Sequence, residues 1–420
     1  TGCTGDTFTT ASTTVYGSSC TLTNDGSASV SVAASTFTDA TGNANSVSNT
    51  YSWTQDDTGP TMTITSATVD SGSSTNTGAA VMVYTSNEVT TNFALVDITV
   101  TECSNAAFTT ESSTVYGSTC TEDANGVSPT VLVAADKFTD ALANDNTASN
   151  TYSWTYDTAD PTMTITSTAG TADGGSSNVE AFALTFTSNE ATANFAVGDI
   201  TATGGHGCTL GSFSSSSTSV YTATCTPDNS GETVNVLVAA NSYTDTAGNG
   251  NAVSNTFDWT WDGTGPTMTI TSNTVASGAT TATAAVVLIY TSNEATTNFA
   301  LVDITETGCT GDTFTTTSTT VYGSTCTVSA DGAASVLVAA STFTDATSND
   351  NSVSNTYSWT QDDTKPTMTI TSNTIASGGT TATAAVVLIY TSNEATTDFA
   401  LVDITETGCT GDTFTTTSTT

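Results

Sequence analysis

Residues 266–272 read PTMTITS, and the same seven letters return at three other places in the chain. Met268 and Ile270 alternate with threonines, so this segment has one apolar face and one hydroxylated face. That alternation is typical of a half-buried β-strand. The four copies begin at Pro60, Pro161, Pro266 and Pro366, a spacing of 100 to 105 residues. The chain is therefore a tandem array, and the repeat decides its architecture.

Near the end of each repeat stands a tryptophan, at Trp53, Trp154, Trp259 and Trp359. Two copies, 266–320 and 366–420, differ at only three positions. We expect five domains: a partial repeat at 1–57, whole repeats at 58–158, 159–263 and 264–363, and a partial repeat at 364–420. Residues 1–14 match 407–420, so the sequence begins and stops in the middle of a repeat.

One period contains six or seven segments of strand length and no apolar pattern of helical spacing. In the third whole repeat the predicted strands are 267–272, 284–291, 303–306, 321–328, 335–339 and 355–360. Short strands separated by turns every 8 to 12 residues favour a sandwich of two β-sheets. The linkers, such as 56–60 (DDTGP) and 157–161 (DTADP), are short and end in proline. They leave little freedom between domains, so we expect an extended, semi-rigid rod.

These residues resemble a known family. The motifs PTMTITS, YTSNEATTNFALVDITETG, FTDA and YSW together resemble the bacterial Ig-like repeats of large secreted surface proteins and adhesins. The resemblance implies tandem immunoglobulin-like β-sandwich repeats of about 100 residues. Members of that family serve as spacers, adhesin stalks and surface-layer components, and several bind calcium between domains. Fold alone does not give the task of one protein.

Charge excludes several classes of partner. The chain has 40 acidic residues, two lysines, no arginine and one histidine, for a net charge of −38. Such a surface cannot neutralise phosphates, so nucleic acid is excluded as a partner. An anionic membrane surface is disfavoured for the same reason. The longest apolar run, residues 284–290, is only long enough for a strand, so we expect no membrane insertion. Without an initiator Met or a signal peptide, we expect a mature or excerpted product.

Cysteines occur in pairs that are each 17 residues apart: Cys3 with Cys20, Cys103 with Cys120, Cys208 with Cys225, and Cys309 with Cys326. We predict one disulfide per repeat between neighbouring strands, each stabilising its domain by roughly 3 kcal/mol. A metal site is the alternative, but there is no CxxC pair and almost no histidine. Disulfides indicate an oxidising environment, so we expect an extracellular or cell-surface location. Cys409 lacks a partner because the sequence stops before the next expected position.

Carboxylates recur at the same positions of each repeat. In the first whole repeat they lie in the linker (56–60), the SNE turn (86–88), the VDIT segment (96–99) and the FTDA loop (138–141), and we use these names for the equivalent segments of the other repeats. In a sandwich these loops emerge where the preceding linker arrives, so we expect them to converge on it. Calcium takes six to eight oxygen ligands, which such clusters offer. The predicted calcium ligands are Asp56, Asp57, Glu88, Asp97 and Asp140; Asp157, Asp160, Glu190, Asp199 and Asp245; and Asp262, Glu294, Asp303 and Asp345. The alternative is that these residues only form turns and caps.

No enzyme is predicted. His206 has no counterpart in the other repeats, whereas a catalytic triad or metal centre needs two or more such rare residues. Paired carboxylates suit glycoside hydrolysis, but here they recur with every domain, as structural ligands do.

We therefore expect an extracellular structural repeat protein that forms a stiff stalk, fibre or filament. An adhesin region that binds glycans or cell surfaces is the alternative. The expected partners are neighbouring copies of the chain, with strand complementation between the two partial repeats. The sequence contains no Asn-x-Ser/Thr acceptor site, whereas its rows of threonine leave O-linked glycans open.

Overall fold

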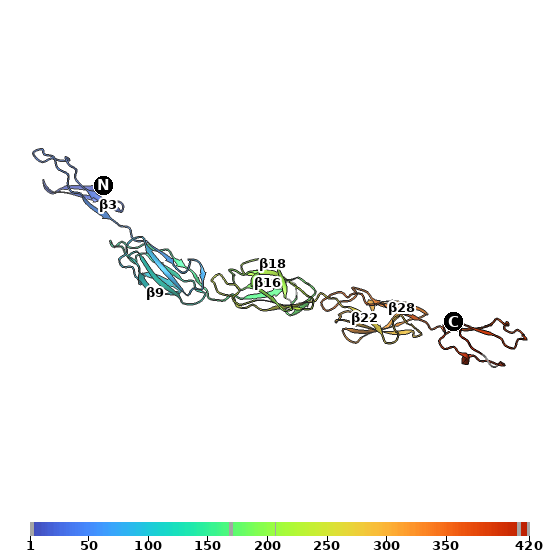
Figure 1. Cartoon of the computed structure of the whole chain (residues 1–420). Coiled ribbons are helices and arrows are strands. Elements are labelled where there is room, and N and C mark those ends of the chain that lie inside the picture. Colours follow the sequence, from blue (N-terminus) through green and yellow to red (C-terminus); the bar gives the residue numbers. More distant parts are fainter. Residues whose placement is uncertain (1–3, 168–170, 206, 410–412, 418–420) are drawn as a thin grey trace. The chain divides into compact units, whose positions relative to one another are not determined.

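The computed structural model describes residues 4–167, 171–205, 207–409 and 413–417, drawn in Figure 1. Cys3 and His206 lie outside these residues. The chain divides into two compact units, residues 1–175 with 181–260 and residues 176–180 with 261–420. Within the described ranges the regular structure is β-strand with four short 3-10 turns and no α-helix. The chain is all-β, as the sequence predicts.

The first whole repeat is a sandwich of antiparallel sheets with a short parallel pair at its end. Its four-stranded sheet has the order β5 (Met62–Ser66), β7 (Ala79–Ser86), β10 (Val115–Glu122), β9 (Cys103–Thr110). The facing sheet has the order β12 (Tyr152–Ser153), β11 (Thr130–Val133), β8 (Ile98–Thr101), and the parallel pair is β13 (Thr155–Tyr156) with β6 (Ser74–Thr75). The 3-10 turn η1 (Leu95–Asp97) precedes β8.

The second whole repeat has the same strand order. One sheet runs β14 (Met163–Ser167), β16 (Phe182–Ser188), β19 (Val220–Pro227), β18 (Cys208–Ser215). The other contains β21 (Phe257–Trp261), β20 (Thr233–Val238) and β17 (Ile200–Thr203) in that order. Beside β21 this sheet ends on the edge strand β15 (Gly175–Ser177), and the turn η2 (Val197–Asp199) precedes β17.

The third whole repeat lies in the second unit. Its sheets run β22 (Met268–Ser272), β24 (Ala285–Ser292), β27 (Val321–Thr327), β26 (Thr310–Thr316) and β23 (Thr280–Thr281), β29 (Tyr357–Gln361), β28 (Gly332–Val338), β25 (Ile304–Thr307). The turn η3 (Leu301–Asp303) occupies the first residue of the predicted strand 303–306. The predicted strand list lacked β26 and β23, because the threonine-rich segment 310–316 contains a single large apolar residue, Phe314.

The partial repeats contain fewer strands. Their elements are β1 (Thr4–Thr10), β2 (Tyr16–Thr21), β3 (Gly26–Val30), β4 (Tyr51–Gln55), β30 (Met368–Ser372), β31 (Leu388–Ser392) and η4 (Leu401–Asp403). Side chains that are buried in a whole repeat are uncovered here. Ile370 is 59% exposed, whereas its counterpart Ile270 is 2% exposed.

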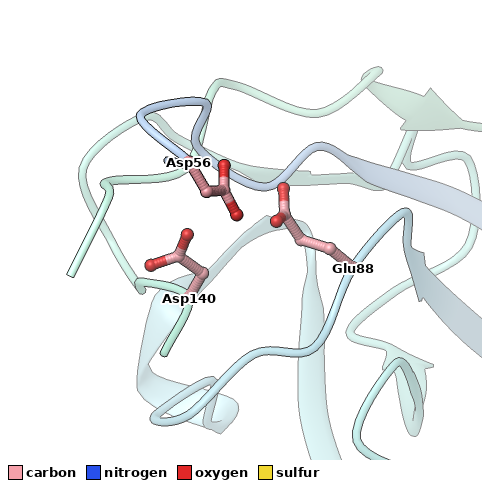
Figure 2. A group of neighbouring side chains, drawn as sticks. All are labelled: Asp56, Glu88 and Asp140. Carbon is pink, nitrogen blue, oxygen red and sulfur yellow. The ribbon is translucent and has the colours of Figure 1, made fainter. Parts of the chain in front are cut away.

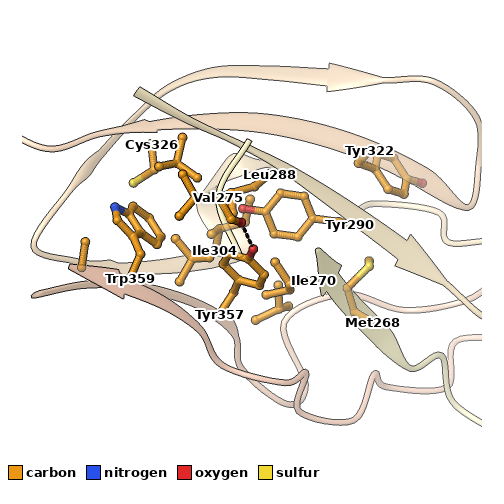
Figure 3. Packing of buried hydrophobic residues seen from close by; sticks show 14 of the residues in the cluster. Met268, Ile270, Val275, Leu288, Tyr290, Ile304, Tyr322, Cys326, Tyr357 and Trp359 are labelled. Atoms are coloured by element: carbon orange, nitrogen blue, oxygen red, sulfur yellow. Dashed lines mark hydrogen bonds between the residues drawn. The ribbon is translucent and has the colours of Figure 1, made fainter. Parts of the chain in front are cut away.

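Each whole repeat has its own hydrophobic core. Three separate clusters lie within residues 62–154, 163–259 and 268–359. Period-2 alternation builds them, since Met268 and Ile270 of β22 are buried and the threonines between them are exposed. Figure 3 shows Trp359 and Tyr357 of β29 facing Ile270 and Leu288, with the Tyr357 hydroxyl donating to the main-chain oxygen of Val275. The five-domain division itself stays a prediction.

Three of the predicted disulfides lie between neighbouring strands of one sheet. Cys103–Cys120, Cys208–Cys225 and Cys309–Cys326 have Cα–Cα separations of 5.6, 5.5 and 5.6 Å. In each pair the second cysteine is fully buried against the core. Every bridge therefore staples an edge strand to its neighbour inside one repeat. The fourth predicted pair includes Cys3 and falls outside the described residues, while Cys409 is exposed and free.

A side-chain amide closes one edge of each sandwich. Asn150 accepts from the main-chain nitrogen of Ile64 at 2.7 Å and donates to its main-chain oxygen at 2.9 Å. Asn255 and Asn355 make the same pair of bonds to Ile165 and Ile270. Since β5, β14 and β22 are edge strands, this amide satisfies main-chain groups that no neighbouring strand pairs.

Candidate metal centre

Three groups of three carboxylates occur among the described residues, one for each whole repeat. Each group takes one residue from the linker before the repeat, one from the SNE turn and one from the FTDA loop. Within a group, one oxygen of each residue lies within 4.8 Å of the others. The groups are Asp56, Glu88 and Asp140; Asp157, Glu190 and Asp245; Asp262, Glu294 and Asp345. Figure 2 shows the first group, whose three side chains lie near one another.

An asparagine in the FTDA loop holds the linker in place. The side-chain nitrogen of Asn144 donates to the main-chain oxygen of Asp56 at 3.1 Å and to Oδ2 of Asp140 at 2.8 Å. Asn249 bonds Asp157 and Asp245 in the same way at 2.9 and 2.8 Å. One side chain therefore fixes two of the three acidic residues relative to each other.

The loop aspartate is built into its turn. Asp140 is buried, and its Oδ1 accepts from the main-chain nitrogens of Leu142 at 2.7 Å and Asn144 at 2.9 Å. Burial by itself raises the pKa of Asp140, but the hydrogen bonds from Asn144 and Leu142 outweigh it, so the pKa lies below its ordinary value. The pKa of Asp345 is lowered in the same way, with bonds from Asn349 and Thr347 outweighing burial. This carboxylate is thus held in its ionised form.

The glutamate has the opposite tendency. The SNE turn is anchored by Asn87, whose Oδ1 accepts from the main-chain nitrogen of Thr61 at 2.6 Å. Burial raises the pKa of Glu88, and the charges of Asp56 and Asp140 raise it further. The pKa values of Glu190 and Glu294 are raised for the same reasons by their own partners. Three carboxylates are therefore held together although their charges repel.

This donor set suits a hard cation. The groups contain only carboxylate oxygens and neither sulfur nor imidazole, which is the ligand chemistry of calcium and magnesium and not that of structural zinc. Oδ2 of Asp140 accepts one hydrogen bond, from the side chain of Asn144, and so keeps a second lone pair that could face an ion. A divalent ion at the common centre would offset the repulsion that raises the glutamate pKa.

Several predicted ligands lie elsewhere. Asp97, Asp199 and Asp303 close the 3-10 turns, because Oδ2 of each accepts from the main-chain nitrogen three residues before it at 2.8 to 2.9 Å. Asp57 contacts the turn of the preceding repeat, because its main-chain nitrogen donates to Oδ1 of Asp25 at 2.8 Å. Asp160 is exposed and is not among the grouped residues.

Of the further residues around the acidic groups, sequence reasoning expected Asn144 nearby and passed over Asp25 and Asp331. The loop asparagines carry a readable signal, a DxxxNxN spacing that returns at Asp140, Asp245 and Asp345. Asp25 and Asp331 precede a turn glycine, and Oδ1 of each accepts from the linker that follows its repeat, at 2.8 Å in both cases. The sequence signal for these two aspartates is weak, because a repeat between them uses an asparagine instead. There Oδ1 of Asn125 accepts from the main-chain nitrogen of Thr158 in the linker.

Comparison with known proteins gives one family match. Residues 157–260 match the sequence model of a family described as the bacterial Ig-like domain. Similar solved structures include FdeC, an adhesin of Escherichia coli, at 13% identity over 71% of this chain and 96% of that one, with a TM-score of 0.36. InvD of Yersinia pseudotuberculosis matches at 12% identity over 72% and 98%, with a TM-score of 0.36. The bacterial integrin-binding protein invasin matches at 12% identity over 86% and 70%, with a TM-score of 0.34.

Identities and TM-scores of this size say nothing of what the present chain binds. No curated protein matches it. In the part of the chain that the structure describes, no helix is long and apolar enough to cross a membrane.

Proposed function

We propose, from the match of residues 157–260 to the bacterial Ig-like domain and from the likeness of the other repeats to this one, that the chain is a stalk-forming region of an extracellular or cell-surface protein. Each repeat is a disulfide-stapled sandwich, and calcium at the repeat junctions stiffens the array. The role that we propose is structural: the stalk acts as a spacer, and it catalyses no reaction.

One observation carries this proposal: each acidic group joins a linker aspartate to two carboxylates of the repeat that follows. A cation bound there would hold the linker against the repeat that follows it. The linker is also bonded to the repeat before it, because Asp57 and Thr58 both donate to Asp25. A linker restrained on both sides suits a spacer that keeps its length.

Calcium is the ion that we propose. Each of the three carboxylates provides at least one oxygen, and nearby main-chain carbonyls and water complete a coordination of six to eight. Magnesium demands a tighter octahedron and keeps more of its water, so a site of flexible carboxylates favours calcium over it.

The location and partners are part of the same proposal. Disulfides in every whole repeat support an oxidising location outside the cytosol. Neighbouring copies of the chain are the partners that we propose. Exposed threonines support O-linked glycans.

Small-angle scattering of the chain, in calcium and in a chelator, tests this function. We expect a single extended form in calcium and a broader distribution of shapes in chelator, because the carboxylates then repel. Identical scattering curves would rule out cation stiffening. Binding of the chain to glycans or host cells through a whole repeat would favour the adhesin alternative.

A further inference from the structure

The four linkers differ at the residue before proline, which is Gly59, Asp160, Gly265 or Lys365. Of these four residues, only Asp160 has a carboxyl group in its side chain. This carboxyl group is placed to form a five-membered ring with its own main-chain carbonyl carbon. Asp160–Pro161 is therefore a distinct chemical bond within an otherwise repetitive chain.

The structure explains why two of the other three linkers have glycine at this position. A Cβ on Gly59 would lie 1.8 Å from the main-chain oxygen of Asp145, and a Cβ on Gly265 would lie 2.0 Å from that of Asp350. In the junction that contains Asp160, the loop position equivalent to Asp145 and Asp350 is Gly250. Linker and loop have thus exchanged residue types: among the three linkers that are followed by a whole repeat, only this one combines a side chain before the proline with a glycine in the loop.

The two residues that form this bond have different surroundings. Asp160 is exposed to solvent, whereas Pro161 is buried. The main-chain oxygen of Pro161 accepts from the nitrogen of Ala252 at 2.9 Å, and Thr162 donates to Oδ1 of Asn189 at 2.6 Å. The charged residues of this junction are all acidic: Asp157 in the linker, Glu190 and Asp245 in the repeat that follows.

We propose that Asp160–Pro161 is a site of self-scission in acid, independent of any cation at the junction. A carboxyl oxygen of Asp160 attacks the main-chain carbonyl carbon of the same residue. The bond to the Pro161 nitrogen breaks, and that nitrogen, which belongs to a tertiary amide and carries no hydrogen, takes a proton from the solvent. Water then opens the cyclic anhydride and leaves Asp160 as a new C-terminus with two carboxyl groups. No oxidant or second protein takes part.

The cut separates the array into two pieces. Cys103–Cys120 lies in residues 1–160, while Cys208–Cys225 and Cys309–Cys326 lie in 161–420. None of these three bridges joins the pieces, and the cores of the whole repeats are left uncut. Acid would thus release the repeats that follow residue 160 from those that precede it.

The test incubates the oxidised 420-residue chain at about pH 3, below the ordinary aspartate pKa of about 3.9, and at about pH 7. Intact mass and non-reducing electrophoresis follow the products. We expect fragments 1–160 and 161–420 in acid only. Asp160→Gly, which installs the residue of two other linkers, should abolish this cut. Asp160→Glu, which keeps the charge but requires a six-membered ring, should also lose it over the same time.

Circular dichroism at neutral pH checks that both variants fold. An intact wild-type chain in acid, a cut that survives Asp160→Gly, or equal cutting of Asp160→Glu would each overturn the proposal.

Discussion

The side-chain amide of Asn255 takes the place of a neighbouring strand for Ile165. Its Oδ1 accepts from the main-chain nitrogen of Ile165 at 2.7 Å, and its Nδ2 donates to the main-chain oxygen at 3.1 Å. Ile165 is 2% exposed, so water does not replace these bonds easily. The segment that carries Asn255 also bonds the other sheet, because Ser254 exchanges hydrogen bonds with Val238. One residue thus seals the edge of the sandwich.

Asn255→Ala should destabilise its repeat by about 2 kcal/mol or more, because two buried main-chain groups lose their partners. Hydrogen exchange at the amide of Ile165 measures this locally, and we expect a clear loss of protection there. Asn255→Asp is the matched control, since it keeps the acceptor and removes the donor. An effect of Ala no larger than that of Asp would mean that the donated bond alone matters.

The Cys208–Cys225 disulfide should contribute to the stability of its repeat separately from Asn255. Replacing both Cys208 and Cys225 by serine should lower the free energy of unfolding of that repeat by about 3 kcal/mol, the value for closing a loop of this size. Urea unfolding followed by Trp259 fluorescence reports on this repeat, because Trp259 is buried in its core. The Cys309–Cys326 bridge remains as an internal reference. An unchanged midpoint would show that the bridge adds no stability.

The linker glycine should not tolerate a side chain where an aspartate stands in the loop. Gly265→Ala places a Cβ 2.0 Å from the main-chain oxygen of Asp350, so the linker must move. We expect a loss of about 1–3 kcal/mol, as for other overpacked sites, together with weaker calcium binding, because Asn349 bonds Asp262 at 2.7 Å.

Gly198→Ala is the control for this change, since a Cβ there meets no atom within 4 Å. Calorimetric titration of calcium compares the two variants with the wild type. Equal affinity in all three proteins would contradict the coupling between linker position and the cation site.

Two carboxylates of one cluster should respond to neutralisation with opposite signs when no cation is bound. The pKa of Glu294 is raised in the folded chain, so the folded state binds the proton more tightly there than the unfolded state does. Stability from this group is present at low pH and is lost as pH rises above the ordinary value of 4.5. The pKa of Asp345 is lowered, so its stability is present above 3.8 and is lost as pH falls.

In chelator at pH 7, Glu294→Gln should therefore raise the unfolding temperature, whereas Asp345→Asn should lower it. Thermal unfolding by circular dichroism measures both changes. In calcium each variant should be less stabilised than the wild type, because each loses a ligand. Destabilisation by Glu294→Gln in chelator would contradict the repulsion that we infer for this cluster.

Much of the fold follows from local pattern. The alternation in PTMTITS and in the segment before each tryptophan placed the strands of the core, and the cysteine spacing gave the pairs that the structure joins. Local pattern was insufficient at β26, where threonine occupies both faces. Threonine suits a strand and tolerates water, so its presence does not reveal which face is buried.

The candidate site was predictable in part. The three acidic residues of each group could be named because the linker, the SNE turn and the FTDA loop recur with each repeat. Asp97 and its counterparts recur in the same way and were expected to converge on the linker, yet each caps a turn three residues long. Recurrence does not separate a ligand from a cap. The asparagine that joins loop and linker depends on contacts between residues 88 positions apart, which no local pattern records.

Thermal unfolding of the whole chain in increasing calcium tests the central claim most directly. We predict a midpoint that rises with calcium, by an amount that corresponds to about 2.7 kcal/mol at one hundred times the dissociation constant, and a smaller rise with magnesium. The variant Glu88→Gln, Glu190→Gln, Glu294→Gln should lose most of this response. A wild-type midpoint that is the same in calcium and in chelator would contradict the claim that these junctions bind the ion.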